Sequence, residues 1–501
     1  MHKIEISLKQ HTPIIHFQHN QDGATLRASE VKPKLDRFLL MKLGDGNYAQ
    51  GIEIARNRGW LIGKGEHPAL DYKMRIRLNI DMENFHIFEM NVPERRRNRN
   101  TNQDTIRTRY SKRYGRNIPS LTSYPLFFGN MDIDYDSDNA ELKRLAFAYY
   151  LKLELTFPDK IGNTSLCAFF TKEFICEFFL KTNFGSRQSK GFGSFYIDED
   201  DTDWYVEPST MYSFNIDAAG DHLDDEFKNL FNSIDLFYKT LRGGVNLKDR
   251  GGNTTFYFKS LAFMYAKDQL NALWDKRAVK EEFYNEGRRY DYKKDEHGNI
   301  IEVKEIDSLE KQCHEHNNDN FGEPLFLNLF KETNNDIDKN SNEVKTLNFC
   351  DIRDLLGFST DEQWMSFKDS IEKKCAIVTG GRPRFPNRNE VLPVERMQSP
   401  LLFKPIYNDD GSYTIFLVFQ DDRVGMDNFK RQQKICFYSK SELDEQGKPK
   451  RFMLDIPDVF SLHGYFDYIF NILRFDISTH VETRYHHREE YQILENIYSQ
   501  L

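Results

Sequence analysis

The chain has 501 residues and carries 69 Lys and Arg against 78 Asp and Glu, which gives a formal net charge of −9. That length predicts two or three domains, and a content of 39% apolar and 14% aromatic residues excludes a largely disordered chain. The acidic balance excludes nucleic-acid binding through positive charge spread over the whole protein, so any RNA or DNA site must be a local cationic patch.

The cysteines and the N-terminus indicate the compartment. The six cysteines are scattered without a C-x-x-C pair, which is typical of reduced thiols rather than of a disulfide framework or a zinc site. The first residues lack the apolar core of a signal peptide, and no segment approaches the roughly 18 apolar residues of a membrane span. We therefore expect a cytoplasmic protein with no membrane segment, no metal and no cofactor.

The first 40 residues combine a strand with a basic helix. Residues 3–8 alternate apolar and polar side chains, which predicts a strand. Ser29 suits the N-cap of a helix over residues 29–39, because Leu35, Phe38 and Leu39 share one helical face. This region also holds four cations within eleven residues: Arg27, Lys32, Lys34 and Arg37. They could bind phosphates or only solvate the exposed helix face, and the pattern leaves both open.

A strongly basic segment follows a second strand, which we predict over residues 74–80. Residues 94–116 contain nine Lys and Arg against Glu94 and Asp104, a local charge of +7. Because this segment has almost no aliphatic side chains, we predict a mobile insertion over about residues 91–120. It could grip phosphates, or its charges could merely keep a long loop in water.

A Gly-rich segment ends the first half of the chain. We predict a helix over residues 140–150, a strand over 151–157 and a helix over 166–180, and then this loop over residues 183–195. Glycine would let backbone N–H groups approach an anionic chain, because it lacks Cβ and tolerates positive φ. Arg187 and Lys190 would add charge for phosphates, and Phe192 could meet the face of a base. The alternative is a turn with two solvated cations. The candidate RNA-binding residues here are Arg187, Ser189, Lys190, Gly191, Phe192 and Gly193.

The second half restarts near residue 204. An amphipathic helix over residues 230–241 ends at Arg242, and Lys259 follows a further pair of glycines; both cations are RNA-binding candidates. Residues 285–345 are polar and lack apolar periodicity, which predicts a surface insertion. Strands over 401–405 and 413–419 precede a closing helix over 460–475. The pattern predicts an α+β fold with two ferredoxin-like (RRM-type) domains, residues 1–203 and 204–501, both with long insertions.

Two motifs resemble a known family. The segment from Ala24 to Lys32, which contains Leu26-Arg27-Ala28-Ser29, and the segment Ser189-Lys190-Gly191-Phe192-Gly193-Ser194 are similar to those of the RAMP superfamily of CRISPR effector subunits. The resemblance covers residues 1–40 and 140–196 and, less closely, 240–285 and 380–420. It is greatest to the large two-RRM subunit of type III-B (Cmr) complexes. It implies partners in guide RNA and other effector subunits, with target RNA as a further candidate.

Three functions follow from this resemblance. The first is a non-catalytic subunit of a type III effector that holds guide RNA by its backbone, near the 3′ end, and supports target RNA capture in antiviral defence. The second is a metal-independent endoribonuclease that processes guide precursors, with His16 or His19 as general base and Asp22 as a further candidate. The third is a structural scaffold without RNA contact. His480, His486 and His487 lie near several glutamates, but without an H-E-x-x-H spacing we assign them to a polar C-terminal helix.

Overall fold

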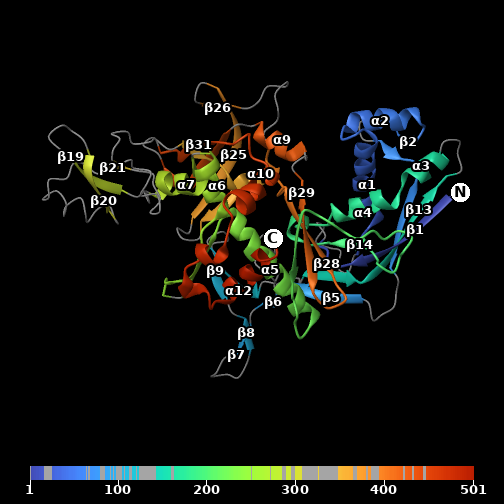
Figure 1. The fold of residues 1–501 in the computed structure, drawn as a ribbon, viewed down its shortest axis with the longest axis horizontal. Coiled ribbons are helices and arrows are strands. Elements are labelled where there is room, and N and C mark those ends of the chain that lie inside the picture. Colours follow the sequence, from blue (N-terminus) through green and yellow to red (C-terminus); the bar gives the residue numbers. More distant parts are fainter. Residues whose placement is uncertain are drawn as a thin grey trace. The chain divides into compact units, whose positions relative to one another are not determined.

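A computed structural model gives the fold of the chain (Figure 1). It describes residues 2–15, 25–63, 65, 68–78, 85–90, 92–93, 95–97, 104–106, 108–111, 116–119, 121–122, 143–158, 163–249, 251–270, 272–284, 289–294, 300–306, 325–326, 348–364, 369–379, 382–384, 394–420, 424–431, 434–443 and 447–501. The described residues mix helices and strands, which confirms the α+β class. Within these residues, none of the helices combines the length and the apolar character needed to cross a bilayer.

The chain divides into two compact units. Unit 1 comprises Met1–Phe237, Leu401–Val418 and Glu489–Leu501, and unit 2 comprises Tyr238–Pro400 and Phe419–Arg488. The first boundary therefore falls inside helix α5 (Leu223–Arg242) rather than at residues 203/204. Pieces from the C-terminal half also return to unit 1, which local sequence patterns do not reveal.

A four-stranded antiparallel sheet organises unit 1. Its order is β14 (Phe195–Ile197), β1 (His2–Gln10), β13 (Tyr150–Phe157) and β4 (Lys73–Leu78). Helix α1 (Ala28–Leu43) lies between β1 and β4 in sequence, and α4 (Lys172–Leu180) lies between β13 and β14. This is the β-α-β-β-α-β connection. The strands predicted over residues 3–8, 74–80 and 151–157 are confirmed as β1, β4 and β13.

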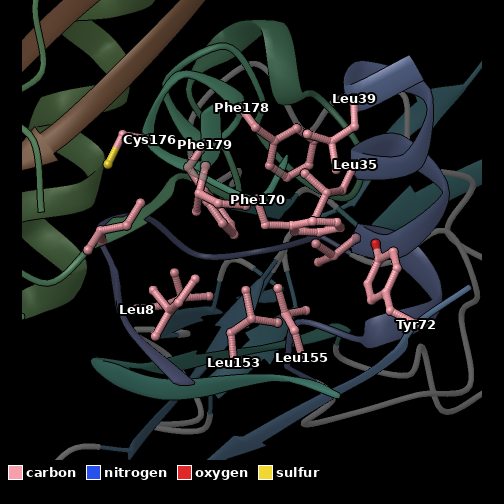
Figure 2. Packing of buried hydrophobic residues seen from close by; sticks show 14 of the residues in the cluster. Leu8, Leu35, Leu39, Tyr72, Leu153, Leu155, Phe170, Cys176, Phe178 and Phe179 are labelled. Atoms are coloured by element: carbon pink, nitrogen blue, oxygen red, sulfur yellow. The ribbon is translucent and has the colours of Figure 1, made fainter. Parts of the chain in front are cut away.

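The core of unit 1 lies between this sheet and its helices. Figure 2 shows Leu8, Leu153 and Leu155 pointing from the sheet toward Leu35 and Leu39 of α1 and toward α4. Successive side chains of a strand alternate between faces, so the residues between these leucines point to the other side of the sheet. Full burial of a leucine or phenylalanine side chain stabilises the fold by about 1.5–3 kcal/mol. Because the buried leucines all point to one face of the sheet, the helices pack on that face only.

Three local predictions were wrong in part. Residues 143–148, expected in a helix, form β12 (Lys143–Ala148) against β5 (Phe85–Met90), because strand pairing and burial of Phe147 override helical composition. The helix expected over residues 166–180 is broken into α3 (Asn163–Phe169) and α4, since Thr171 is extended and caps α4 through Phe174 N–H. Helix α1 begins with Arg27, not Ser29, at its N-cap.

The remaining elements of unit 1 are short apart from α5. Within the basic segment, expected as a mobile insertion, the described residues form paired strands, β7 (Arg95–Arg97) with β8 (Asp104–Ile106) and β9 (Thr108–Ser111) with β10 (Arg116–Pro119). The other elements are α2 (Tyr48–Asn57), β2 (Leu61–Ile62), β3 (Ala69–Leu70), β6 (Val92–Pro93), β11 (Leu121–Thr122), η3 (Gln188–Lys190), β15 (Tyr212–Ile216), β28 (Leu401–Tyr407), β29 (Tyr413–Phe419) and α12 (Glu489–Tyr498).

Unit 2 is built on a different sheet. Its order is β18 (Ala272–Trp274), β22 (Asn348–Cys350), β31 (Pro449–Asp455), β30 (Lys434–Leu443), β25 (Asp369–Thr379) and β24 (Asp361–Trp364), with β26 (Arg382–Arg384) beside β25. The pairings of β18 with β22 and of β22 with β31 are parallel. A second four-stranded antiparallel domain is therefore not confirmed.

Short helices and hairpins complete unit 2. The closing helix expected over residues 460–475 is α10 (Leu462–Asp467) followed by a π-helical turn, η5 (Tyr468–Ile472). Residues of the polar insertion form β19 (Arg289–Lys294), β20 (Ile300–Ile306) and β21 (Leu325–Phe326). The others are β16 (Val245–Lys248), β17 (Thr254–Phe258), α6 (Leu261–Leu270), α7 (Asp275–Tyr284), η4 (Arg353–Leu356), β23 (Phe358–Ser359), β27 (Arg396–Met397), α9 (Val424–Lys430), α11 (Ile477–His480) and η6 (Thr483–Tyr485).

A network of charged side chains is buried in unit 2. Lys373 Nζ lies 2.8 and 2.9 Å from the two carboxylate oxygens of Asp354 and 2.7 Å from Glu362, and these carboxylates raise the pKa of Lys373 to about 12 although its burial opposes the shift. Arg353 bonds Asp275 and Glu362, each at 2.5 Å. Burial, and then the nearby carboxylates of Asp354 and Asp275, raise the pKa of Asp351 well above its ordinary value.

Candidate nucleic-acid interface

The Gly-rich loop of unit 1, residues 183–195, has a fixed shape because its glycines occupy positions that other residues cannot. Gly185, Gly191 and Gly193 have φ of +79°, +92° and +66°. A Cβ on Gly193 would stand 2.0 Å from the backbone oxygen of Phe184, and one on Gly185 would stand 2.4 Å from that of Ile15. Glycine is thus required both by the left-handed backbone and by the close approach of a second segment.

The second segment is the chain just after β1. Gly193 N–H donates to Pro13 O at 2.8 Å and Ser186 N–H to Ile15 O at 2.7 Å. The hydroxyl of Thr12 donates to Gly191 O at 2.6 Å and accepts from Ser194 N–H at 2.9 Å. The segment after β1 and the Gly-rich loop are therefore joined by a set of hydrogen bonds.

The sequence predicts that the glycines let backbone N–H groups contact an anionic chain, but these hydrogen bonds give the N–H groups another role. The N–H groups of Gly191 and Gly193 already donate within the protein, to Gln188 O and Pro13 O. Ser189 is buried, and both glycines are buried as well. The loop glycines shape the backbone; the side chains of Arg187 and Lys190 are half-buried, and the Lys190 Nζ atom itself is buried.

Phe192 is part of the core. Its ring is 0% exposed and stacks on Phe231 of α5 with centroids 3.7 Å apart and an interplanar angle of 11°. A base could not reach either face without displacing this packing, so the expectation that Phe192 meets a base is not supported. The stacking partner lies 39 positions further along the chain, beyond the range of local pattern.

Helix α1 is fastened to the loop by Lys34. Its ammonium lies 3.0 Å from Asn183 O and 2.8 Å from Gln188 Oε1, and 5.0 Å from the centre of the Phe184 ring. Arg27 stands at the N-cap of the same helix, about 10 Å away along the axis at 1.5 Å per residue. One helix therefore carries cations from its first turn to the edge of the loop.

The other two cations of α1 differ in their surroundings. Lys32 bonds Asp36 at 2.7 Å and Leu70 O at 3.0 Å, and its ammonium lies 3.9 Å from the centre of the Tyr72 ring. Burial of Asp36 raises the pKa of its carboxyl, and the Lys32 charge opposes that rise. Lys32 therefore stabilises the packing of the helix. Arg37 is exposed and lies over Tyr48 at 5.1 Å, where its guanidinium faces water.

Lys404 of β28 also binds the backbone around the Gly-rich loop. This residue was not predicted from the sequence. This side chain is 0% exposed and donates to Phe195 O at 2.7 Å, Thr182 O at 3.1 Å and Asn183 Oδ1 at 3.2 Å. Burial lowers the pKa of Lys404 well below its ordinary value, and the charge of Lys34 lowers it further. A lone lysine within the apolar strand LLFKPIY was the available signal, since such a residue must find buried acceptors.

The histidine and aspartate candidates have separate outcomes. His16, His19 and Asp22 lie outside the described residues. Their neighbour His11 is buried, and its Nδ1 accepts from Tyr407 N–H at 3.0 Å, which places the proton of the neutral ring on Nε2. Burial, and then the charges of Lys404 and Lys9, keep the pKa of His11 well below its usual range. His11 is thus a neutral core residue.

Arg242 and Lys259, the remaining candidates, lie in unit 2. Arg242 donates to Arg353 O at 3.0 Å, Gly357 O at 3.1 Å and Asp354 Oδ1 at 3.3 Å, so its guanidinium is used by the buried network. Lys259 lies over the Phe263 ring at 4.9 Å, and its backbone oxygen contacts His480 Nε2 at 2.8 Å. His480 packs on Phe258 and Phe475 rather than on a polar surface. In the part of the chain that is described, no cluster of His, Cys, Asp or Glu is arranged to hold a metal.

Comparison with known proteins places the chain in a family. The family models of the Cmr1 N-terminal domain and the Cmr1 C-terminal domain match residues 1–245 and 257–496. A chain of a cryo-EM structure of a type III-B Cmr-beta complex, bound to cognate target RNA and AMPPnP in the presence of ssDNA, is 15% identical with a TM-score of 0.23; the match covers 38% of this chain and 54%, about half, of that one. No curated protein matches. Because the two domain models together span nearly all of its length, the chain belongs to the Cmr1 family, the large RAMP subunits of type III-B CRISPR effector complexes.

Proposed function

We propose that this chain acts in the cytoplasm as the subunit that holds the backbone of guide RNA, near its 3′ end, and supports target RNA capture in antiviral defence. The observation that carries the proposal is the bonding of Lys34 to Asn183 and Gln188, which brings the basic helix and the Gly-rich loop into one element. Arg27, at the N-cap of α1, therefore belongs to the same helix and loop as Arg187 and Lys190, in a chain whose net charge is negative.

The chemistry of this element favours backbone binding without sequence preference. It carries the guanidinium groups of the half-buried Arg27 and Arg187, a type of group that binds phosphates, whereas Lys190 Nζ and the nearby phenylalanines are buried. A strand held only through phosphates binds with an affinity that falls steeply as salt increases. That is suited to a subunit that must accept guides of many sequences.

The experiment replaces the half-buried cations at the N-cap of α1 and in the Gly-rich loop. The triple variant Arg27→Gln, Arg187→Gln and Lys190→Gln should lose most of the RNA that copurifies with the protein and should bind oligouridine more weakly. Its salt slope, the change in the logarithm of the binding constant with the logarithm of salt concentration, should be shallower by about 2, because each phosphate contact contributes about 0.7. A matched control, Lys374→Gln, Lys434→Gln and Lys440→Gln, removes three lysines of unit 2 whose side chains are 39–59% exposed. Unchanged RNA content and slope in the first variant would refute this site.

The nuclease alternative remains a prediction, since His16, His19 and Asp22 lie outside the described residues. Cleavage of repeat RNA in the presence of a chelator, abolished by His16→Ala or His19→Ala, would establish it. The scaffold alternative predicts that the complex assembles equally well with and without RNA.

A further inference from the structure

The face of the unit 1 sheet that points away from α1 and α4 is a second charged surface. Since Leu153 and Leu155 point into the core (Figure 2), Lys152 and Glu154 of β13 point to the opposite side. By the observed register, Glu5 of β1 and Arg75 of β4 lie on either side of Glu154. The cationic sheet face, as we name it, consists of Lys3, Glu5, Lys73, Arg75, Arg77, Lys152 and Glu154.

Cations outnumber carboxylates on this face by five to two. The two carboxylates are shared: Glu5 pairs with Lys152 at 2.5 Å, and Glu154 pairs with Arg77 at 3.3 Å and with Lys3 at 3.5 Å. The side chains of Lys3, Lys152 and Arg77 nevertheless remain 46–58% exposed. An excess of three positive charges therefore stays at the surface of a protein whose formal net charge is −9.

The cations of β4 form a row. Lys73, Arg75 and Arg77 are all exposed and stand at every second position of a strand at the edge of the sheet. Side chains two residues apart on one face are separated by about 6.6–6.8 Å. A line of charges at that spacing fits an anion that extends along the strand better than a single phosphate group.

The composition of the face decides which partner it fits. Tyr150, half-buried, stands at one end of the face opposite Lys9, but the seven residues named contain no aromatic or aliphatic side chain, so a protein partner would find among them no apolar anchor of the kind that provides most binding energy. RNA bases would likewise find no stacking platform among these seven residues. A phosphate backbone needs neither.

We infer that the cationic sheet face binds the phosphate backbone of a single-stranded RNA segment, without base stacking. This inference rests on the proposed function in so far as the ligand is RNA. The surface itself is distinct from the element formed by α1 and the Gly-rich loop, because α1 and α4 pack on the other face of the same sheet. Unit 1 would thus contact RNA on both faces of its sheet.

The test compares salt slopes of full-length variants. In Lys73→Gln, Arg75→Gln and Arg77→Gln together, three exposed cations are removed and the side chains remain polar, so the fold should be kept, as circular dichroism would verify. Binding of oligouridine should then have a salt slope shallower by about 2. The control variant Lys374→Gln, Lys434→Gln and Lys440→Gln should leave the slope unchanged.

The outcomes separate this inference from the proposed function. If the unmodified chain binds no RNA, the proposed function fails. If it binds and only the Arg27, Arg187 and Lys190 variant changes the slope, the sheet-face inference fails while the proposed function stands. A photo-crosslinking residue placed at Arg75 in the assembled complex should capture RNA, and capture of a protein subunit instead would also overturn the inference.

Discussion

The ammonium group of Lys34 lies 2.8 Å from Oε1 of Gln188 and 3.0 Å from the backbone oxygen of Asn183, so α1 is bonded directly to the Gly-rich loop. Lys34→Met keeps a side chain over Phe184 but removes both hydrogen bonds from the charged donor. We expect a loss of about 1–3 kcal/mol and weaker RNA binding, because the loop cations would no longer be held beside the helix. Hydrogen exchange of residues 183–195 and RNA affinity measure the two effects. Equal exchange in variant and parent would show that Lys34 does not position the loop.

Lys404 of β28 should also stabilise the Gly-rich loop. Lys404→Met leaves three acceptors, Thr182 O, Phe195 O and Asn183 Oδ1, without their donor. Each unsatisfied buried group costs about 1–3 kcal/mol, against which the removal of a buried charge is a partial gain. We expect net destabilisation of unit 1 and faster exchange of the Gly193 amide. Lys228→Met, on the exposed side of α5, is the matched control. A stability equal to that of the control would contradict the role.

The elements that sequence predicted correctly are those whose periodicity agrees with their environment. Strands β1, β4 and β13 alternate because one face of each packs on the core. The failures have long-range causes. Strand β12 depends on its pairing with β5, and Phe192 is buried by a ring on α5. Lys404 meets Asn183 across 221 positions, a contact that no local pattern contains.

Asp354 and Asp351 of unit 2 should respond oppositely to the same substitution. Asp354→Asn removes a carboxylate whose two oxygens accept hydrogen bonds from Lys373 Nζ at 2.8 and 2.9 Å. The ammonium, 1% exposed, would lose one of its two carboxylate partners and keep Glu362 at 2.7 Å, so the cost should be at most that of a fully broken buried pair, about 3–5 kcal/mol. We expect unit 2 to unfold at markedly lower urea concentration.

Asp351→Asn should instead preserve or increase stability at neutral pH. The raised pKa of Asp351 means that the folded state binds its proton more tightly than the unfolded state. Stability is therefore lost as pH rises above the unfolded value, and asparagine removes that loss while its oxygen can still accept Asp354 N–H. Urea unfolding at pH 5 and pH 8 checks the sign. A variant that is less stable than the parent by a similar amount at both pH values would show that the ionisation of Asp351 is irrelevant.

His480 should make unit 2 sensitive to acid. Burial lowers the pKa of His480 to about 4, although its hydrogen bond to Lys259 O opposes the shift. The unfolded state then binds a proton more readily than the folded state, so stability is lost as pH falls from about 6.5 toward 4, by about 3 kcal/mol in full. His480→Gln can still donate to Lys259 O but does not titrate, so its stability should fall less over this range. Urea unfolding at pH 7, 5.5 and 4.5 compares the two proteins, and the NMR titration of His480 reports its pKa directly. A titration midpoint near 6.5, with parallel pH dependence in the two proteins, would mean that the ring is solvated and not packed between Phe258 and Phe475.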